Sequence, residues 1–117
     1  MADGIAAVRE VDPDGWIFLE PTSLLNAFPY PGDLDPERLV DPRDGPSRLV
    51  YAGHLYEFST HDGLGYPPDN PYVADWERLR PEEATALDAA LWFGEWGGPA
   101  DQDRFDTYVA DVMAMAD

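Results

Sequence analysis

The chain has 117 residues, 44% of them hydrophobic and 13% aromatic, so its length and composition predict one compact domain spanning residues 1–117. Its 24 acidic residues outnumber the 7 basic ones and give a formal net charge of −17. A chain this acidic repels DNA, RNA and anionic lipid surfaces, so we expect no direct binding to nucleic acids or membranes. The absence of cysteine excludes disulfides, thiolate metal sites and thiol nucleophiles.

The acidity has three possible origins. It can reflect adaptation to high salt, or a GC-rich genome that favours aspartate and arginine over lysine. It can also be functional, because a negative field steers a protein toward a basic surface and raises the association rate. Composition alone does not separate these origins.

The N-terminal residues Met1 to Gly4 show no basic segment followed by an apolar run. No stretch reaches the roughly 18 consecutive apolar residues of a membrane-spanning helix. These patterns predict a cytoplasmic protein.

Two short β-type segments, Ile5–Val11 and Trp16–Glu20, are separated by Asp12-Pro13-Asp14-Gly15. Asp first, Pro second and Gly fourth is the preferred order of a type I turn. The pattern therefore predicts an antiparallel hairpin.

The stretch from Pro21 to Pro46 loses periodicity and gathers proline, glycine and aspartate, which disfavour long helices and central strands. We expect an ordered loop with single helical turns at Thr22–Ala27 and Pro36–Val40. It is not predicted to be a domain boundary.

The segment Arg48–Ser59 is rich in β-formers and is apolar on both of its alternating faces. Such a strand is expected to be central and covered on both sides. Gly53 within it indicates a bulge, a close approach of another group or a turn between two shorter strands. Residues 61–71 are then predicted to form a loop that crosses from the sheet to the helices.

The segment Pro81–Trp96 has clear signals for the start and the end of a helix. Proline is tolerated in the first turn, where Glu82 and Glu83 also complement the helix dipole. Gly97-Gly98-Pro99 is typical of a helix end. The pattern predicts a helix from Pro81 to Trp96.

On that helix, Trp92 and Trp96 are expected to point away from the core, with Asp88 and Glu95 beside Trp92. One interpretation is that a loop or the next helix covers the tryptophans, or that the helix frays before Trp96. The other is that they form a partner-binding face, since Trp is enriched at interface hot spots. The sequence leaves both interpretations open.

The last segment, Asp101–Ala116, places its apolar residues on one stripe and is predicted to be an amphipathic helix. Asp103 and Asp106 lie near its start and Asp111 on its flank. Strands precede helices in this order, so the predicted fold class is α+β: a small antiparallel sheet of about three strands, packed by two C-terminal helices.

Few residues indicate chemistry. His54, His61 and Asp62 could form a metal or acid–base site, although His54 lies in a strand pattern that favours a core or interface histidine. Asp12–Gly15 and Asp33–Glu37 contain closely spaced carboxylates but lack the Gly and terminal Glu of an EF-hand loop. No phosphate loop, dinucleotide fingerprint, GxSxG or HExxH motif is found. The sequence thus predicts no enzyme, no metal and no cofactor.

The leading functional hypothesis is a small acidic inhibitor that occupies the basic nucleic-acid-binding surface of a target protein, as DNA mimics, anti-CRISPR-like proteins and immunity proteins do. The alternative is an interaction or assembly module that uses an aromatic patch. The residues predicted to bind the partner, a basic protein, are Asp88, Trp92, Glu95, Trp96, Asp103, Asp106 and Asp111.

Overall fold

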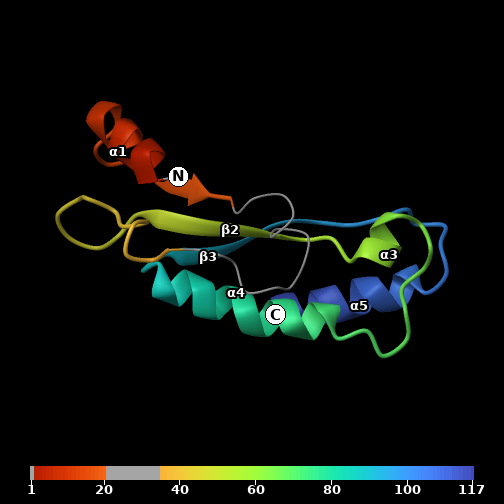
Figure 1. Cartoon of the computed structure of the whole chain (residues 1–117). Helices are drawn as coiled ribbons and strands as arrows, with labels where there is room; N and C mark the ends of the chain where they lie inside the picture. The colour runs from red at the N-terminus through yellow and green to blue at the C-terminus, as the bar shows by residue number, and fades with distance from the viewer. Residues whose placement is uncertain (1, 21–34) are drawn as a thin grey trace.

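The computed structural model describes residues 2–20 and 35–117. The elements in chain order are α1 (Ala2–Val11), β1 (Ile17–Leu19), β2 (Leu49–Leu55), α3 (Phe58–His61), α4 (Tyr72–Ala86), β3 (Ala90–Trp96) and α5 (Phe105–Ala116) (Figure 1). The three strands form one sheet in the order β1-β2-β3, and both pairs are parallel. The predicted α+β fold with an antiparallel sheet is therefore wrong.

The strand predicted at Arg48–Ser59 is present as β2, but it ends at Leu55, and Phe58 and Ser59 belong to helix α3. Six of its seven residues are buried, and it pairs with β1 on one side and β3 on the other. The register between β2 and β3 shifts between Gly53 and Leu55, but the extra residue lies in β3 and not at Gly53. The expected close approach at Gly53 is present, because a Cβ atom there would lie 3.2 Å from the indole of Trp76, which would have to move slightly to admit it.

Helices α4 and α5 lie along one face of the sheet (Figure 1). Alternate residues of β2 point to them because strand side chains have a period of two. Tyr51 donates a hydrogen bond to Glu83 of α4 at 2.8 Å, and the hydroxyl of Tyr108 in α5 donates to the carbonyl of Leu55 at 3.1 Å. The intervening residues of β2 therefore point to the opposite face.

Two groups of buried side chains hold the layers together. One joins α1 to the first two strands and the end of α4: Ile5, Leu19, Leu39, Leu49, Tyr51, Ala84 and Leu87. The other lies between the end of β2 and helices α4 and α5: Leu55, Tyr66, Tyr72, Val73, Trp76, Tyr108 and Val112.

The predicted hairpin at the N-terminus is wrong because Ile5–Val11 belongs to helix α1. Its buried residues, Ile5 and Arg9, are four apart, which is the spacing of one helical face. The carboxylate of Asp12 accepts hydrogen bonds from the backbone N–H groups of Asp14 and Gly15, at 3.2 and 2.8 Å. The expected hairpin turn is therefore a side-chain-stabilised turn between a helix and a strand.

The predicted helix Pro81–Trp96 is also wrong, because Pro81 lies inside α4 and the helix ends before residue 90. Asp88 has a left-handed backbone with φ of 50°, and the N–H of Ala89 bonds to the carbonyl of Ala84 at 2.9 Å. This is a C-terminal capping arrangement in which aspartate takes the place usually held by glycine. The remainder of the expected helix is strand β3.

The predicted C-terminal helix is confirmed as α5, although it begins at Phe105 rather than near Asp101. The turn predicted at Pro36–Val40 is present, since the N–H groups of Arg38 and Leu39 both bond to the carbonyl of Asp35. The turn predicted at Thr22–Ala27 lies outside the described residues. No helix in the described part of the chain is long and apolar enough to cross a membrane.

Candidate active site

The carboxyl ends of the three parallel strands lie at the same edge of the sheet. In parallel sheets with helices packed outside, catalytic residues are found at this edge. Here six residues lie near it on the sheet face that points away from α4 and α5. We call this surface the site face: Phe18, Glu20, His54, Tyr56, Trp92 and Glu95.

Glu95 is directed to the site face by the irregularity in β3. Gly53 pairs with Phe93 and Leu55 pairs with Trp96, so Gly94 and Glu95 together oppose the single residue His54. Two residues opposite one is the arrangement of a β-bulge, which re-aims side chains near active sites.

Two side chains of the central strand segment contact the Glu95 carboxylate. The hydroxyl of Tyr56 donates a hydrogen bond to Oε2 at 2.9 Å, and Nδ1 of His54 lies 3.6 Å from the same oxygen. Partial burial, together with this hydrogen bond to Glu95, raises the pKa of Tyr56 above its ordinary value of 10.0. Tyr56 therefore remains a protonated donor at neutral pH, and the arrangement holds one oxygen of Glu95 in place.

The ring of His54 lies between two carboxylates. Nε2 is 3.9 Å from Oε1 of Glu20, on the side opposite to Glu95. A Cβ atom at Gly94 would come within 2.9 Å of Cδ2 of this ring, so only glycine allows the imidazole to sit where it does. The position of the His54 ring therefore depends on the absence of a side chain at Gly94.

An aromatic pair covers the middle of the site face. The rings of Phe18 and Trp92 meet edge to face with centroids 6.1 Å apart, and each residue is 55% exposed. Ligand sites commonly combine aromatic side chains with a few polar groups. The pair lies on the same face of the sheet as His54 and Glu95.

The two loops that leave β2 and β3 are bonded to each other. The side chain of Gln102 donates to the carbonyls of Thr60 and Pro99, at 2.8 and 2.7 Å, and accepts from the N–H of Gly65 at 3.0 Å. Glu57, buried beside Tyr56, caps α3 by accepting from the backbone N–H and the hydroxyl of Thr60. These contacts fix the loops at the carboxyl edge of the sheet.

The structure does not bring the seven predicted partner-binding residues together on one face. Trp92 and Glu95 lie on the site face, but Trp96 points to the other side and packs against Tyr108 at 5.9 Å between ring centroids. Asp88 lies in the turn between α4 and β3. The other three carboxylates are exposed and lie near or within α5: Asp103, Asp106 and Asp111.

The other candidate residues have structural partners. The ring of His61 packs against that of Tyr56, with centroids 5.2 Å apart. Asp14, from the first carboxylate cluster, pairs with Arg43 at 3.1 Å. In the second cluster, Asp33 and Leu34 lie outside the described residues. Within residues 2–20 and 35–117, no group of three or more His, Asp or Glu side chains is placed to hold a metal ion.

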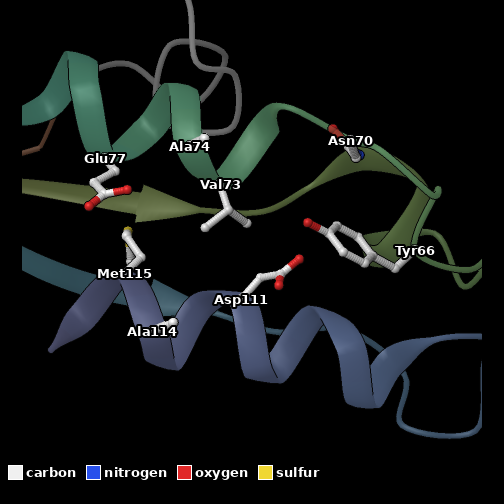
Figure 2. A pocket seen from close by; sticks show the side chains of 8 residues that line it. All are labelled: Tyr66, Asn70, Val73, Ala74, Glu77, Asp111, Ala114 and Met115. Atoms are coloured by element: carbon white, nitrogen blue, oxygen red, sulfur yellow. The ribbon is translucent and has the colours of Figure 1, made fainter.

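A separate cavity of about 270 Å³ lies on the helical side, between α4 and α5 (Figure 2). Tyr66 and Asp111 point toward one another across it (Figure 2). Burial, followed by a hydrogen bond to Asp111, raises the pKa of Tyr66 well above its ordinary value. The cavity is lined by residues of the helices and of the loop before α4, and by none of the six residues of the site face.

Comparison with known sequences gives a match over the whole chain. Residues 1–117 match the profile of the family described as cellulase (glycosyl hydrolase family 5). The chain belongs to glycosyl hydrolase family 5. No match was found among curated proteins.

Solved structures of endo-glycoceramidase II from Rhodococcus sp. resemble this family 5 chain. Its complex with ganglioside GM3 has a TM-score of 0.79 at 25% identity, and its complex with a cellobiose-like imidazole has a TM-score of 0.76 at 27% identity. A further structure of the same enzyme gives a TM-score of 0.76 at 28% identity. Each match covers 96% of this chain but only 26% of the neighbour, so the chain spans about a quarter of its solved neighbours.

The family assignment corrects two predictions. The predictions of an acidic inhibitor and of a protein that is not an enzyme are wrong, because the matches are to a family of glycosidases and to TIM-barrel-like enzymes. The family 5 chain accordingly shows three parallel strands with helices outside, as expected for a section of such a barrel. The predicted basic protein partner stays a prediction.

Glu20 and Tyr56 of the site were not predicted. Glu20 directly follows β1, and Tyr56 directly follows β2. Their place in a common site can be inferred only when the strands are known to be parallel. Glu95 was predicted as a partner-binding carboxylate on a helix. The only local signal for a strand between Ala90 and Trp96 is the group of three aromatic residues, Trp92, Phe93 and Trp96.

Proposed function

We propose that this chain supplies the nucleophilic carboxylate, Glu95, to the active site of a family 5 glycoside hydrolase. Glycoside hydrolases of the common type use two carboxyl groups, one as acid and one as nucleophile or base. The observation that carries the proposal is the hydrogen bond of 2.9 Å from the hydroxyl of Tyr56 to Oε2 of Glu95, at the carboxyl edge of a parallel sheet.

The role of nucleophile suits Glu95 better than the role of acid. The acid must carry a proton and donate it to the leaving oxygen, whereas a carboxylate that accepts a hydrogen bond is favoured in its ionised form. Tyr56 and His54 both contact Oε2, so we assign the attack to Oε1.

Glu20 is the other carboxylate of the site face. Its oxygen faces Nε2 of His54 rather than Glu95, and we assign it no acid role. About three quarters of each solved neighbour's chain lies outside the matched part. We propose that the acid is a carboxyl group in the part of the barrel that corresponds to the unmatched part of these neighbours.

The proposed substrate is a glycan with a cellobiose-type sugar at the site. One solved neighbour holds a cellobiose-like imidazole and another holds ganglioside GM3, so a glucan and a glycolipid headgroup are the two substrate classes that the comparisons support. The exposed rings of Phe18 and Trp92 offer an apolar surface on the same face of the sheet.

Covalent trapping tests the role of Glu95 without requiring the acid. A 2,4-dinitrophenyl 2-deoxy-2-fluoro-cellobioside has a leaving group that departs without protonation, so the nucleophile alone should form a glycosyl ester. We expect release of one dinitrophenolate per chain, together with a matching mass increase on the peptide that contains Glu95. The Glu95→Gln variant should not be labelled, whereas Glu10→Gln, an exposed carboxylate on α1, should be labelled like the wild type. Labelling of the Glu95→Gln variant, or a label on another residue, would overturn the proposal.

A further inference from the structure

The side-chain amide of Gln102 lies where the loops after β2 and β3 meet. Its Nε2 donates to the carbonyl of Thr60 at 2.8 Å and to that of Pro99 at 2.7 Å. Its Oε1 accepts from the N–H of Gly65 at 3.0 Å. A primary amide has two N–H donors and one acceptor oxygen, so each of these groups has a backbone partner. One side chain thus joins three backbone segments.

The two carbonyls lead back to the two members of the Tyr56–Glu95 pair. Thr60 lies four residues after Tyr56, and Pro99 lies four residues after Glu95. The residue after Thr60 is His61, whose ring packs against the ring of Tyr56 with centroids 5.2 Å apart. The amide therefore ties the loop that contacts Tyr56 to the loop that follows Glu95.

The two loops are in direct contact at Gly98. A Cβ atom at Gly98 would lie 2.6 Å from the carbonyl oxygen of Thr60 and 3.0 Å from Nε2 of Gln102. Beside this contact, the N–H of Tyr66 donates to the carbonyl of Asp103 at 3.0 Å. The loops are therefore close-packed, and a displacement of one of them displaces the other.

The hydrogen bond between Tyr56 and Glu95 is not secured by burial. The side chain of Glu95 is 60% exposed, and Tyr56 is only partly buried. Water competes for both groups at such a position, so the bond contributes little free energy of its own. Its formation then depends on how the backbone places the two residues.

We propose that Gln102 is a positioning residue that keeps the hydroxyl of Tyr56 and the carboxylate of Glu95 within hydrogen-bonding distance by joining the loops that follow them. The inference rests on the proposed role of Glu95 as nucleophile. Gln102 acts through the backbone of the two loops and does not touch the reacting atoms.

The alkaline titration of Tyr56 tests this proposal without requiring a reaction. The chain has no lysine and no cysteine, so tyrosine hydroxyls are the side chains that titrate between about pH 9 and 12. The neighbouring rings of His54 and His61 are neutral in this range. Partial burial and then the hydrogen bond to Glu95 raise the pKa of Tyr56 above 10.0, so loss of the contact should lower it.

Carbon-13 spectra of protein labelled at the tyrosine Cζ atoms follow this titration, and the signal absent from Tyr56→Phe identifies Tyr56. The Gln102→Met variant keeps a side chain of similar length but loses all three hydrogen bonds. We expect the pKa of Tyr56 to fall most of the way to 10.0 in this variant. Gly98→Ala, which forces the same loops apart, should lower it as well. Circular dichroism at neutral pH checks that each variant is folded, and Gly98→Ala carries the test if Gln102→Met is not.

The control is Asp41→Asn, which weakens a buried ion pair at the amino end of β2, where Asp41 accepts from the N–H of Arg48. It should destabilise the protein and leave the titration of Tyr56 unchanged. An unchanged pKa of Tyr56 in folded Gln102→Met, or an equal fall in Asp41→Asn, would overturn the role of Gln102 and leave that of Glu95 intact. A covalent label on a residue other than Glu95 would overturn the role of Glu95 without altering this titration.

Discussion

Tyr108 joins the ends of the two strands that carry most of the site. Its hydroxyl donates to the carbonyl of Leu55 at 3.1 Å, and its ring packs against that of Trp96 in β3, with centroids 5.9 Å apart. The residue is fully buried, and burial raises the pKa of its hydroxyl to about 12, so it is protonated at neutral pH. The change Tyr108→Phe removes one oxygen atom and leaves the ring in place.

The expected loss follows from the group left behind. A buried hydrogen bond contributes about 1 kcal/mol, and a buried backbone group without a partner costs about 1–3 kcal/mol. Since Tyr108→Phe removes the donor to the carbonyl of Leu55, we expect the free energy of unfolding to fall by about 1–3 kcal/mol. Urea unfolding followed by circular dichroism measures this difference.

The matched control is Tyr56→Phe, which removes the same atom from a partly exposed side chain. There, water can replace the lost bond to Glu95, so the expected loss is at most about 0.5 kcal/mol. Equal losses in the two variants, or a loss below about 0.5 kcal/mol for Tyr108→Phe, would refute the argument from burial.

Two further substitutions test the scaffold. Arg9 donates two hydrogen bonds to Asp41 and lowers the pKa of that carboxyl from 3.8 to about 2, so this stabilisation is present above about pH 4 and is lost as the pH falls toward 2. The Tm of Asp41→Asn should therefore lie about 5 °C below that of the wild type at pH 6 and approach it near pH 2, as measured by calorimetry; a difference independent of pH would contradict this. Gly98→Ala places a Cβ atom 2.6 Å from the carbonyl oxygen of Thr60 and should lower the free energy of unfolding by about 1–3 kcal/mol in urea, whereas Gly4→Ala, with nothing within 4 Å, should not destabilise the protein.

Elements with strong local patterns could be predicted from the sequence. The strand β2 was found because both of its faces are apolar, and α5 because its apolar residues recur with the helical period. The segment Ile5–Val11 was mistaken for a strand because seven residues fit either period, and tertiary packing selects the helix. Pro81 was mistaken for a helix start because α4 continues through a residue that usually ends one.

The site could be predicted only in part. Trp92 and Glu95 were among the predicted residues, but as parts of a helical face. The convergence of Glu20, Tyr56 and Glu95 depends on parallel pairing between segments about 30 and 40 residues apart, and such pairing leaves no local trace in the sequence. Sites at the carboxyl edge of a barrel are assembled from several strands, so each residue alone looks like an ordinary strand end.

The formal net charge of −17 has a consequence for how copies of the chain behave toward one another. At low ionic strength every copy repels every other, which opposes association. Salt weakens this repulsion because it shortens its range, so the acidity that suggested a partner acts between copies of the chain as a repulsion of limited reach.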